Sequence, residues 1–344
     1  MSTYAALLLP SVNRVYTDAA LHLVQAELEV FSVRLLGGRI TGISTETIAG
    51  VAYITFDGVE LSDRDLSLLG NVSAIYALYQ RESDRLRPIE LRSLDRLDSD
   101  LLTIMKYPGK TNEQFTRLLL NVTLASSRFG ADMLDRRFSV LDPLCGRGTT
   151  LNQALMCGFD AYGIDADARD VDAYATFLQR WLKDKRLKHR SEYGPVRRDR
   201  KVVARRFEAT FAVTKEDFKD GDVQRVDVVN TDTTRALEFM RPGSVDLVVT
   251  DAPYGVQHGS RTGGATLTRS PLELIAEAAP VWAQLLRSGG ALGISWNIRV
   301  ASRRDAVAAV SAAGLDVLEG GPYELFEHRV DQSIQRDVLV AVKN

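Results

Sequence analysis

The chain has 344 residues, of which 45% are hydrophobic and 26% are charged, and its formal net charge at pH 7 is −2. This composition is typical of a globular protein long enough for two domains, and it excludes a disordered chain or a uniformly basic nucleic-acid binder. Because no stretch is long and apolar enough for a membrane span, no basic segment precedes the first apolar run, and only two cysteines occur, we expect a cytoplasmic protein without a disulfide scaffold.

Residues 1–82 predict a small α+β domain. Alternating apolar residues indicate strands, and apolar residues at helical spacing indicate a helix over 17–31. The expected elements, in chain order, are strand 4–9, helix 17–31, strands 39–44 and 51–56, a short helix over 61–69 and strand 72–79. This order is that of the split βαβ, or ferredoxin-like, fold. Residues 83–105, rich in Arg, Asp and Leu, are expected to form a connector.

From residue 106 onward, predicted strands and helices alternate. A helix is expected to begin near Thr111 or Asn112, either of which can cap it, and Ser270-Pro-Leu-Glu273 is a capping box that begins another. Gly289 and Gly290 are expected to end that second helix. The expected strands are 138–141, 161–164, 226–229, 245–249, 291–296, 315–318 and 337–342. Such alternation predicts an α/β fold with a doubly wound, Rossmann-like sheet over 106–344.

Residues 180–206 form a basic insert between the second and third of these strands. They contain twelve Lys or Arg and three acids, a charge of +9, so the remainder of the chain carries −11. The connection is long for two neighbouring strands of such a sheet. It is either an arm that follows a phosphate backbone, which we favour, or a solvated and partly disordered loop.

The strand 138–141 leads into a glycine loop, Asp142-Pro-Leu-Cys-Gly-Arg-Gly-Thr-Thr150. Glycine at the turn from strand to helix lets the backbone approach a ligand, and ligands of open parallel sheets bind beyond the carboxyl ends of the strands. Asp165, at the end of the next strand, is placed to accept hydrogen bonds from both hydroxyls of a ribose. A dinucleotide site has similar geometry, but its third glycine would fall at Leu151, which weakens that interpretation.

Two further residues near this loop have alternative interpretations. Asp232 follows the third strand, where its carboxylate could accept a hydrogen bond from the amine of an adenine, and a solvated loop carboxylate is the simpler alternative. Cys145 lies within the loop, but no base is placed beside it by the sequence, so a nucleophilic role is disfavoured.

A second string, Thr250-Asp-Ala-Pro-Tyr-Gly255, follows the strand 245–249. Asp251 and a carbonyl of the next two residues could accept the hydrogens of an exocyclic amine and so turn its lone pair toward an incoming methyl group. Pro253 stiffens the turn by fixing φ, and Tyr254 can stack on a base that has left its helix. Alone, this string is also typical of an ordinary turn. Behind a glycine loop and a ribose acid, it predicts methyl transfer to an amino nitrogen.

Both strings resemble motifs of the class I S-adenosylmethionine-dependent amino-methyltransferases. The loop 142–150 is similar to their Asp-Pro-Phe-Cys-Gly-Ser-Gly-Thr cofactor loop, and 250–255 is similar to their Asp-Pro-Pro-Tyr catalytic motif. The segment 106–112 resembles the part that lies over the methionine end of the cofactor. Within this class, the ferredoxin-like front domain and the Gly after Tyr254 resemble the tRNA guanine-N2 methyltransferases of archaea and eukaryotes, which act at tRNA position ten.

The resemblance implies a class I methyltransferase domain over 106–344, S-adenosyl-L-methionine as cofactor, and RNA, in particular tRNA, as partner through residues 180–206 and the N-terminal domain. The implied catalytic residues are Asp251, Pro253 and Tyr254. The implied cofactor-binding residues are Lys110, Thr111, Asn112, Asp142, Leu144, Cys145, Gly146, Gly148, Thr149, Thr150, Asp165, Ala166, Asp232 and Thr233. No metal site is expected, because the four histidines are scattered along the chain.

Two features depart from the family pattern. Ala252 stands where the family has its first Pro and is expected to loosen the turn, and the front region is too short for a ferredoxin-like unit plus a full THUMP RNA-binding domain, so RNA docking is expected to differ. Three alternatives remain open. A DNA adenine-N6 or cytosine-N4 methyltransferase shares both motifs, a scaffold would bind the cofactor without catalysis, and a nicotinamide oxidoreductase shares the glycine loop.

Overall fold

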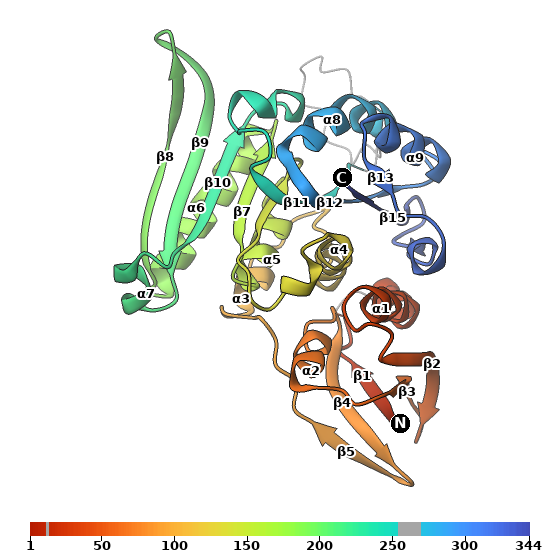
Figure 1. The fold of residues 1–344 in the computed structure, drawn as a ribbon. Coiled ribbons are helices and arrows are strands. Elements are labelled where there is room, and N and C mark those ends of the chain that lie inside the picture. Colours follow the sequence, from red (N-terminus) through yellow and green to blue (C-terminus); the bar gives the residue numbers. More distant parts are fainter. Residues whose placement is uncertain (12–13, 254–269) are drawn as a thin grey trace.

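A computed structural model describes residues 1–11, 14–253 and 270–344 of the chain. Among these residues the strands form two sheets, one of five strands near the N-terminus and one of ten strands beyond it (Figure 1). No helix within the described ranges is long and apolar enough to cross a membrane.

The N-terminal sheet has the order β2-β3-β1-β4-β5, with antiparallel pairing throughout. Its elements are β1 (Ser2–Leu8), α1 (Arg14–Arg34), β2 (Ile40–Ile48), β3 (Val51–Gly58), α2 (Asp63–Leu69), β4 (Ile75–Glu82) and β5 (Arg85–Ile89). The first four strands and two helices confirm the ferredoxin-like pattern. Residues 85–89, expected in the connector, form an additional edge strand, where Pro88 is tolerated because an outward-facing N–H is not needed.

The second part of the chain forms the ten-stranded sheet and its helices. From residue 100 to 184 the elements are α3 (Asp100–Thr103), α4 (Glu113–Ser126), η1 (Gly130–Asp132), β6 (Ser139–Asp142), α5 (Thr149–Met156), β7 (Asp160–Asp165) and α6 (Ala168–Asp184). From 188 to 251 they are β8 (Lys188–Arg198), β9 (Lys201–Ala212), α7 (Lys215–Asp220), β10 (Gln224–Asn230), η2 (Thr233–Glu238) and β11 (Val245–Asp251). From 271 onward they are α8 (Pro271–Leu285), β12 (Leu286–Asn297), α9 (Arg303–Ala312), β13 (Asp316–Val317), η3 (Gly321–Glu324), β14 (His328–Arg329) and β15 (Gln335–Val342).

The centre of this sheet is parallel and has the order β10-β7-β6-β11-β12, which is the third, second, first, fourth and fifth parallel strand in chain order. This is the doubly wound, Rossmann-like arrangement that the sequence predicts. The strand order reverses between β6 and β11, and ligands of such sheets bind beyond the carboxyl ends of the strands at this switch point. The glycine loop follows β6 and Asp251 ends β11, so the topology brings both strings to one crevice.

Helices cover both faces of the sheet. Buried residues of α4, α5 and α6 pack together on one face, and those of α8 and α9 pack on the other. Neighbouring residues of β6 point to opposite faces, with Val140 in the first core and Leu141 in the second. The first core also includes α1, which packs against α4 (Figure 1), so the N-terminal domain and the large sheet share a continuous apolar interior.

Residues 188–212, within and beyond the predicted basic insert, form the long β8-β9 hairpin, which adds two antiparallel strands beside β10 (Figure 1). Phe207 and Phe211 are fully buried on the face that meets α6. The alternative of a partly disordered loop is therefore wrong for these residues. Whether the segment binds phosphates stays a prediction.

Helix boundaries mostly follow the capping residues. Asn112 caps α4 by accepting a hydrogen bond from the Phe115 N–H, and the Ser270–Glu273 capping box begins α8 as predicted. The two glycines 289 and 290 do not end that helix. The helix ends at Leu285, and the glycines lie inside β12, where the pairing with β11 shifts register and a Cβ at Gly290 would approach the Asp246 carbonyl oxygen to 2.6 Å.

Candidate active site

The glycine loop contains two residues in the left-handed region, Gly146 with φ of 48° and Gly148 with φ of 82°. A Cβ at Gly146 would meet no atom within 4 Å, so its backbone is open to a ligand. A Cβ at Gly148 would lie 2.3 Å from the Tyr174 ring. Glycine is thus required at position 148 for its backbone conformation and for packing of α5 near α6. Close approach to a ligand explains why glycine occupies position 146, but not why it occupies position 148.

Asp142 links the glycine loop to the neighbouring strand. Its carboxylate is buried and accepts hydrogen bonds from Thr250 Oγ1 at 2.8 Å and from the Leu144 N–H at 3.1 Å. Burial raises the pKa of Asp142 to about 7, although the hydrogen bonds from Thr250, Thr150 and Leu144 oppose that shift. Since Thr250 belongs to β11, this carboxyl group holds the ends of β6 and β11 together.

Asp165 stabilises the same loop from the end of β7. One carboxylate oxygen accepts the Gly146 N–H at 2.8 Å, and the other accepts the Asp167 N–H at 2.8 Å. Burial raises its pKa above the usual value, while these two backbone hydrogen bonds oppose the shift. The acid therefore fixes the loop conformation, and its contact with a ribose stays a prediction.

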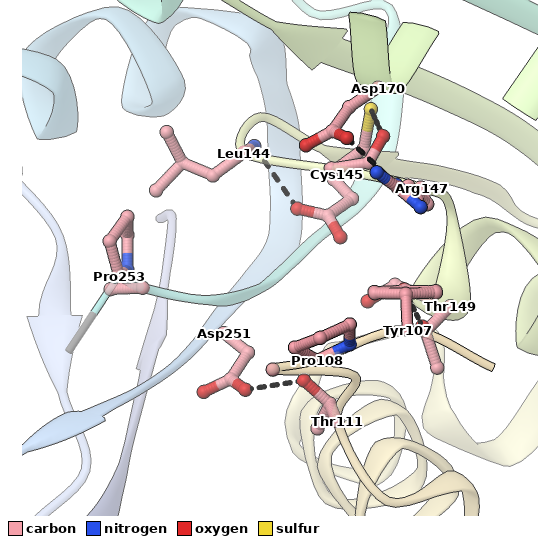
Figure 2. A pocket seen from close by; sticks show the side chains of 15 residues that line it. Tyr107, Pro108, Thr111, Leu144, Cys145, Arg147, Thr149, Asp170, Asp251 and Pro253 are labelled. Carbon is pink, nitrogen blue, oxygen red and sulfur yellow. Dashed lines mark hydrogen bonds and ion pairs between the residues drawn. The ribbon is translucent and has the colours of Figure 1, made fainter. Parts of the chain in front are cut away.

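Asp251 is held by side chains from three separate parts of the chain. Thr111 Oγ1 donates to Oδ2 at 2.6 Å, as Figure 2 shows, and Arg336 Nη2 lies 3.3 Å from the same oxygen. Ser295 Oγ donates to Oδ1. Arg336 is only 3% exposed, and its guanidinium lies 4.2 Å from the centre of the Phe115 ring. These contacts orient the carboxylate beside the glycine loop.

The backbone at Ala252 is fixed in a way that proline does not permit. Ala252 is 1% exposed, and its N–H donates to the Ser295 carbonyl oxygen at 2.8 Å, which extends the pairing of β11 with β12 by one residue. A proline has no N–H to make this bond. The expected loosening of the turn at Ala252 is thus not found. Pro253 follows as an exposed residue, and Tyr254 lies outside the described residues.

One pocket of about 310 Å³ lies between these parts of the chain, close to the lower size expected of a small-molecule site. Figure 2 shows side chains of the loop after β6, of the end of β11 and of the segment before α4 surrounding this space. The predicted site residues that line it are Thr111, Asp142, Leu144, Cys145, Gly146, Thr149, Thr150, Asp251 and Pro253. Residues from both strings therefore share one cavity.

A family model described as "RMKL-like, methyltransferase domain" matches residues 116–289, a range that includes the glycine loop and Asp251. The chain belongs to this family. It is therefore a methyltransferase, and its cofactor is S-adenosyl-L-methionine. The match confirms the class of enzyme that the two strings predict, without specifying the group that is methylated.

Solved structures similar to this methyltransferase include a TehB-like SAM-dependent methyltransferase from Corynebacterium glutamicum, with 17% identity, 62% of this chain and 84% of that chain covered, and a TM-score of 0.33. A precorrin-6y C5,15-methyltransferase from Geobacter metallireducens has 13% identity, coverage of 73% and 98%, and a TM-score of 0.38. An rRNA methylase from Streptococcus thermophilus has 12% identity, coverage of 62% and 92%, and a TM-score of 0.33. Similarity at this level carries no inference about the substrate. No curated protein matches the sequence.

Of the predicted residues outside the pocket lining, two lie at the start of α4. Lys110 Nζ donates to the Leu102 carbonyl oxygen and to Glu113, both at 2.5 Å. Asn112 caps the helix and also donates to Ser11 Oγ at 2.8 Å. Both side chains thus fix the segment that carries Thr111, and a contact with the cofactor stays a prediction for each.

The others follow β7 and β10. Ala166 is exposed, and Asp232 caps η2 by accepting hydrogen bonds from the N–H and hydroxyl of Thr234. Thr233 is buried and accepts a hydrogen bond from Trp282 Nε1 at 2.8 Å. Together with Asp165 and Gly148, these residues do not line the pocket, and their predicted contacts with the nucleoside part of the cofactor stay predictions.

The structure adds pocket residues that the sequence interpretation missed. Arg147 Nε donates to Asp170 at 2.8 Å and its guanidinium lies 5.1 Å from the centre of the Tyr107 ring, while the Tyr107 hydroxyl lies 2.9 Å from Thr149 Oγ1. This cluster forms one wall of the pocket. By contrast, burial raises the pKa of Cys145 well above its usual value, so its thiol stays neutral, in agreement with the disfavoured nucleophilic role.

Ser295 and Arg336 were also missed. The signal that could have found Ser295 is a polar side chain between apolar residues of a buried strand, because polar groups are rarely placed there without a partner. Arg336 has no such signal, because it stands between Gln335 and Asp337.

Proposed function

We propose that this methyltransferase transfers a methyl group to the exocyclic amine of a nucleobase in RNA, with guanine N2 in tRNA as the first candidate. The observation that carries the proposal is the fixed carboxylate of Asp251 in the pocket that the glycine loop also lines. A methyltransferase needs a donor site and an acceptor site in contact, and residues of both strings line one cavity, which supports the proposal.

The residues around the pocket fit the cofactor. The open space at Gly146 allows close approach of a ligand to its backbone, and the buried Asp142 carboxyl lines the cavity. When bound, S-adenosyl-L-methionine supplies an electrophilic methyl group on a positively charged sulfur. Because the pKa of Asp142 is about 7, part of this carboxyl group is anionic at neutral pH, and its negative charge attracts the positively charged sulfur.

On the acceptor side, Asp251 would accept one hydrogen of the target amine and a backbone carbonyl of residues 252–253 would accept the other. Both contacts reduce delocalisation of the nitrogen lone pair into the base and aim it at the methyl carbon. The new N–C bond forms as the S–C bond breaks, and one amine proton then leaves through the Asp251 carboxylate. Alignment of nitrogen, carbon and sulfur supplies most of the rate.

The tRNA assignment has separate support. The resemblance of Thr250–Gly255 to the catalytic motif of tRNA guanine-N2 methyltransferases favours an amino target, and the ferredoxin-like front domain favours RNA. No specific observation favours the DNA alternative.

The direct test is to incubate the protein and tritiated S-adenosyl-L-methionine with total tRNA, total rRNA and unmethylated DNA, and then to analyse the labelled nucleosides. We expect label in tRNA as N2-methylguanosine. Label in DNA as N6-methyladenine or N4-methylcytosine would replace this proposal with the DNA alternative, and cofactor binding without label in any nucleic acid would support a non-catalytic scaffold.

Replacing Asp251 tests the acceptor site. Asp251→Ala should abolish methyl transfer while cofactor affinity, measured by calorimetry, stays near that of the wild type. Since Asp251→Ala removes a buried partner of Arg336, Asp251→Asn is the second variant because it keeps the shape and one acceptor oxygen. We expect Asp251→Asn to fold normally and to lower the transfer rate by roughly 10²-fold, because an amide cannot take up the proton. Full activity of Asp251→Asn would contradict a proton-accepting role.

A further inference from the structure

The β8-β9 hairpin extends past the end of the parallel sheet. The last residue of β10, Asn230, pairs with Arg205 of β9, which in turn pairs with Pro195 of β8. Residues 196–204 therefore continue beyond the carboxyl end of β10, by roughly 13 Å at 3.3 Å per residue. Because β10 is parallel to β7, this is the side of the sheet on which the pocket lies. Figure 1 shows the hairpin turn on the same side as η2 and the start of α8.

Basic side chains of the segment 180–206 differ in their partners. Ion pairs with carboxylates occupy Arg180, Lys185, Arg198, Arg205 and Arg206. Within the described ranges, no carboxylate partner is found for two exposed groups at opposite ends of the hairpin. The tip group is Arg197, Arg200 and Lys201, and the base group is Lys183, Arg186 and Lys188.

The tip group is held in place by its own strands and by the neighbouring segment. The two strands pair from Lys188 with Ala212 up to Arg198 with Lys201, immediately next to the turn. Arg198 contacts Glu238 of η2 with a nitrogen–oxygen distance of 3.2 Å, and its guanidinium lies 5.1 Å from the centre of the Phe239 ring. The tip is therefore fixed beside the segment that follows β10.

Charged residues on an exposed edge strand also protect that edge from pairing with other chains. This explanation is sufficient for charges along β8, which is the outer strand of the sheet. It does not explain why the hairpin continues past the neighbouring strand or why a group of free charges lies at its turn. A surface that must reach a polyanion near the pocket explains both.

We propose that the tip group binds the phosphate backbone of the substrate RNA beside the target nucleotide. This inference rests on the proposed function and narrows the predicted RNA contact from the whole basic segment to Arg197, Arg200 and Lys201. Residues 196–204 contain no aromatic side chain that could stack on a base. The contact is therefore with phosphates, so it positions the RNA without reading its sequence.

The chain offers a matched pair of variants. Arg197→Gln, Arg200→Gly and Lys201→Gln remove three positive charges at the tip, and Lys183→Gln, Arg186→Gly and Lys188→Gln remove three at the base, roughly 30 Å away along β8. Arg186 and Arg200 have φ of 56° and 64°, so glycine fits both positions. Asp-Gly at 199–200 also favours a two-residue hairpin turn, which keeps the tip variant folded.

The probe is total tRNA from cells, with methyl transfer and binding measured between 50 and 200 mM salt. For the tip variant we expect KM for RNA to rise about tenfold or more. The slope of log affinity against log salt should be less steep, by about one for each phosphate contact removed. The base variant and the cofactor affinity of both variants should remain as in the wild type. Equal effects of the two variants, or wild-type salt dependence in the tip variant, would overturn the inference.

The two proposals fail in different ways. If the wild-type protein methylates RNA but the tip variant behaves like the wild type, the phosphate contact is wrong and the proposed function stands. If the wild-type protein binds RNA with tip-dependent affinity but transfers no methyl group to it, the phosphate contact stands and the proposed function is wrong. If the wild-type protein neither binds nor methylates RNA, both are wrong.

Discussion

Gly146 and Gly148 lie two residues apart in one loop, yet the structure requires glycine at each for a different reason. Both have positive φ, which costs a residue with a Cβ roughly 1–2 kcal/mol. Only Gly148 also faces a rigid neighbour, because Tyr174 is fully buried and cannot move away. A Cβ at Gly148 would clash with the Tyr174 ring, whereas a Cβ at Gly146 would meet no atom. Gly148 is therefore needed for folding, and Gly146 for close approach of the ligand.

Alanine at each position should show this difference. Gly148→Ala should lower the free energy of unfolding by roughly 2–5 kcal/mol, the sum of backbone strain and overpacking against the ring. Gly146→Ala should lower it by only about 1–2 kcal/mol, but its new methyl group enters the pocket and should weaken cofactor binding. Urea unfolding and calorimetric titration of the cofactor measure the two effects. Equal losses of stability would contradict the assignment.

At the scale of elements, the surroundings of Asp251 come from separate parts of the chain. The carboxylate ends β11, and its partners come from β12, from β15 and from the segment before α4. Strand register or a helix cap places each partner. Ser295, for example, pairs directly with Asp251 in the sheet. The orientation of one carboxylate thus depends on several backbone contacts that are far apart in sequence.

Removing single hydroxyl groups should affect turnover more than binding. Ser295→Ala and Thr111→Val each delete one donor to Asp251, so the carboxylate is less well aligned and the transfer rate at saturating substrates should fall by about tenfold or more. Cofactor affinity should remain unchanged in Ser295→Ala. Thr111 lines the pocket and is also a predicted cofactor-binding residue, so Thr111→Val is compared at saturating cofactor. Ser126→Ala, which removes a buried hydroxyl bonded to Val122 and Tyr323, is the control and should keep full activity. Wild-type kcat in both test variants would show that these hydroxyls do not position Asp251.

The sequence predicts this site only in part, for reasons visible in particular elements. The glycine loop and Asp251 have local signals, because each stands directly after a buried apolar strand. Ser295 has only the weak signal of a polar residue in a buried strand and Arg336 has none, since the contacts of both with Asp251 depend on how β12 and β15 pair. The β8-β9 hairpin was missed because its turn, Asp199-Arg200, lacks the glycine that usually marks such turns, and because Gly194 and Pro195 interrupt β8.

At the scale of the whole molecule, the N-terminal domain meets the helices of the large sheet at a buried carboxyl group. Glu27 of α1 is fully buried and accepts hydrogen bonds from Ser73 Oγ at 2.5 Å and from Asn121 Nδ2 of α4 at 2.7 Å. It therefore joins the N-terminal domain to a helix that packs on the large sheet. Burial raises the pKa of Glu27 to about 7, and the hydrogen bonds of Ser73 and Asn121 only partly oppose that shift.

This shift makes stability depend on pH with a definite sign. The folded protein holds the Glu27 proton more tightly than the unfolded chain, so the contribution is fully present below the unfolded pKa of 4.5 and is lost as pH rises through about 7. Glu27→Gln mimics the protonated form. The free energy of unfolding of the wild type should decline between pH 5 and pH 8, and the variant should lack up to about 3 kcal/mol of that decline. Urea unfolding at the two pH values measures this. Asp142 also has a raised pKa and causes a similar decline in the free energy of unfolding of both proteins, so the variant is compared with the wild type. Identical pH dependence of the two proteins would contradict the prediction.

The position of β15 in the chain has a consequence for synthesis of the protein. β15 follows all the other described strands of the large sheet in sequence, yet it pairs between β12 and β13 and carries Arg336 to Asp251. A ribosome makes the glycine loop and Asp251 long before Arg336, and a domain generally folds as a unit. The nascent chain can therefore complete the surroundings of Asp251 only after β15, which carries the buried arginine, has been made.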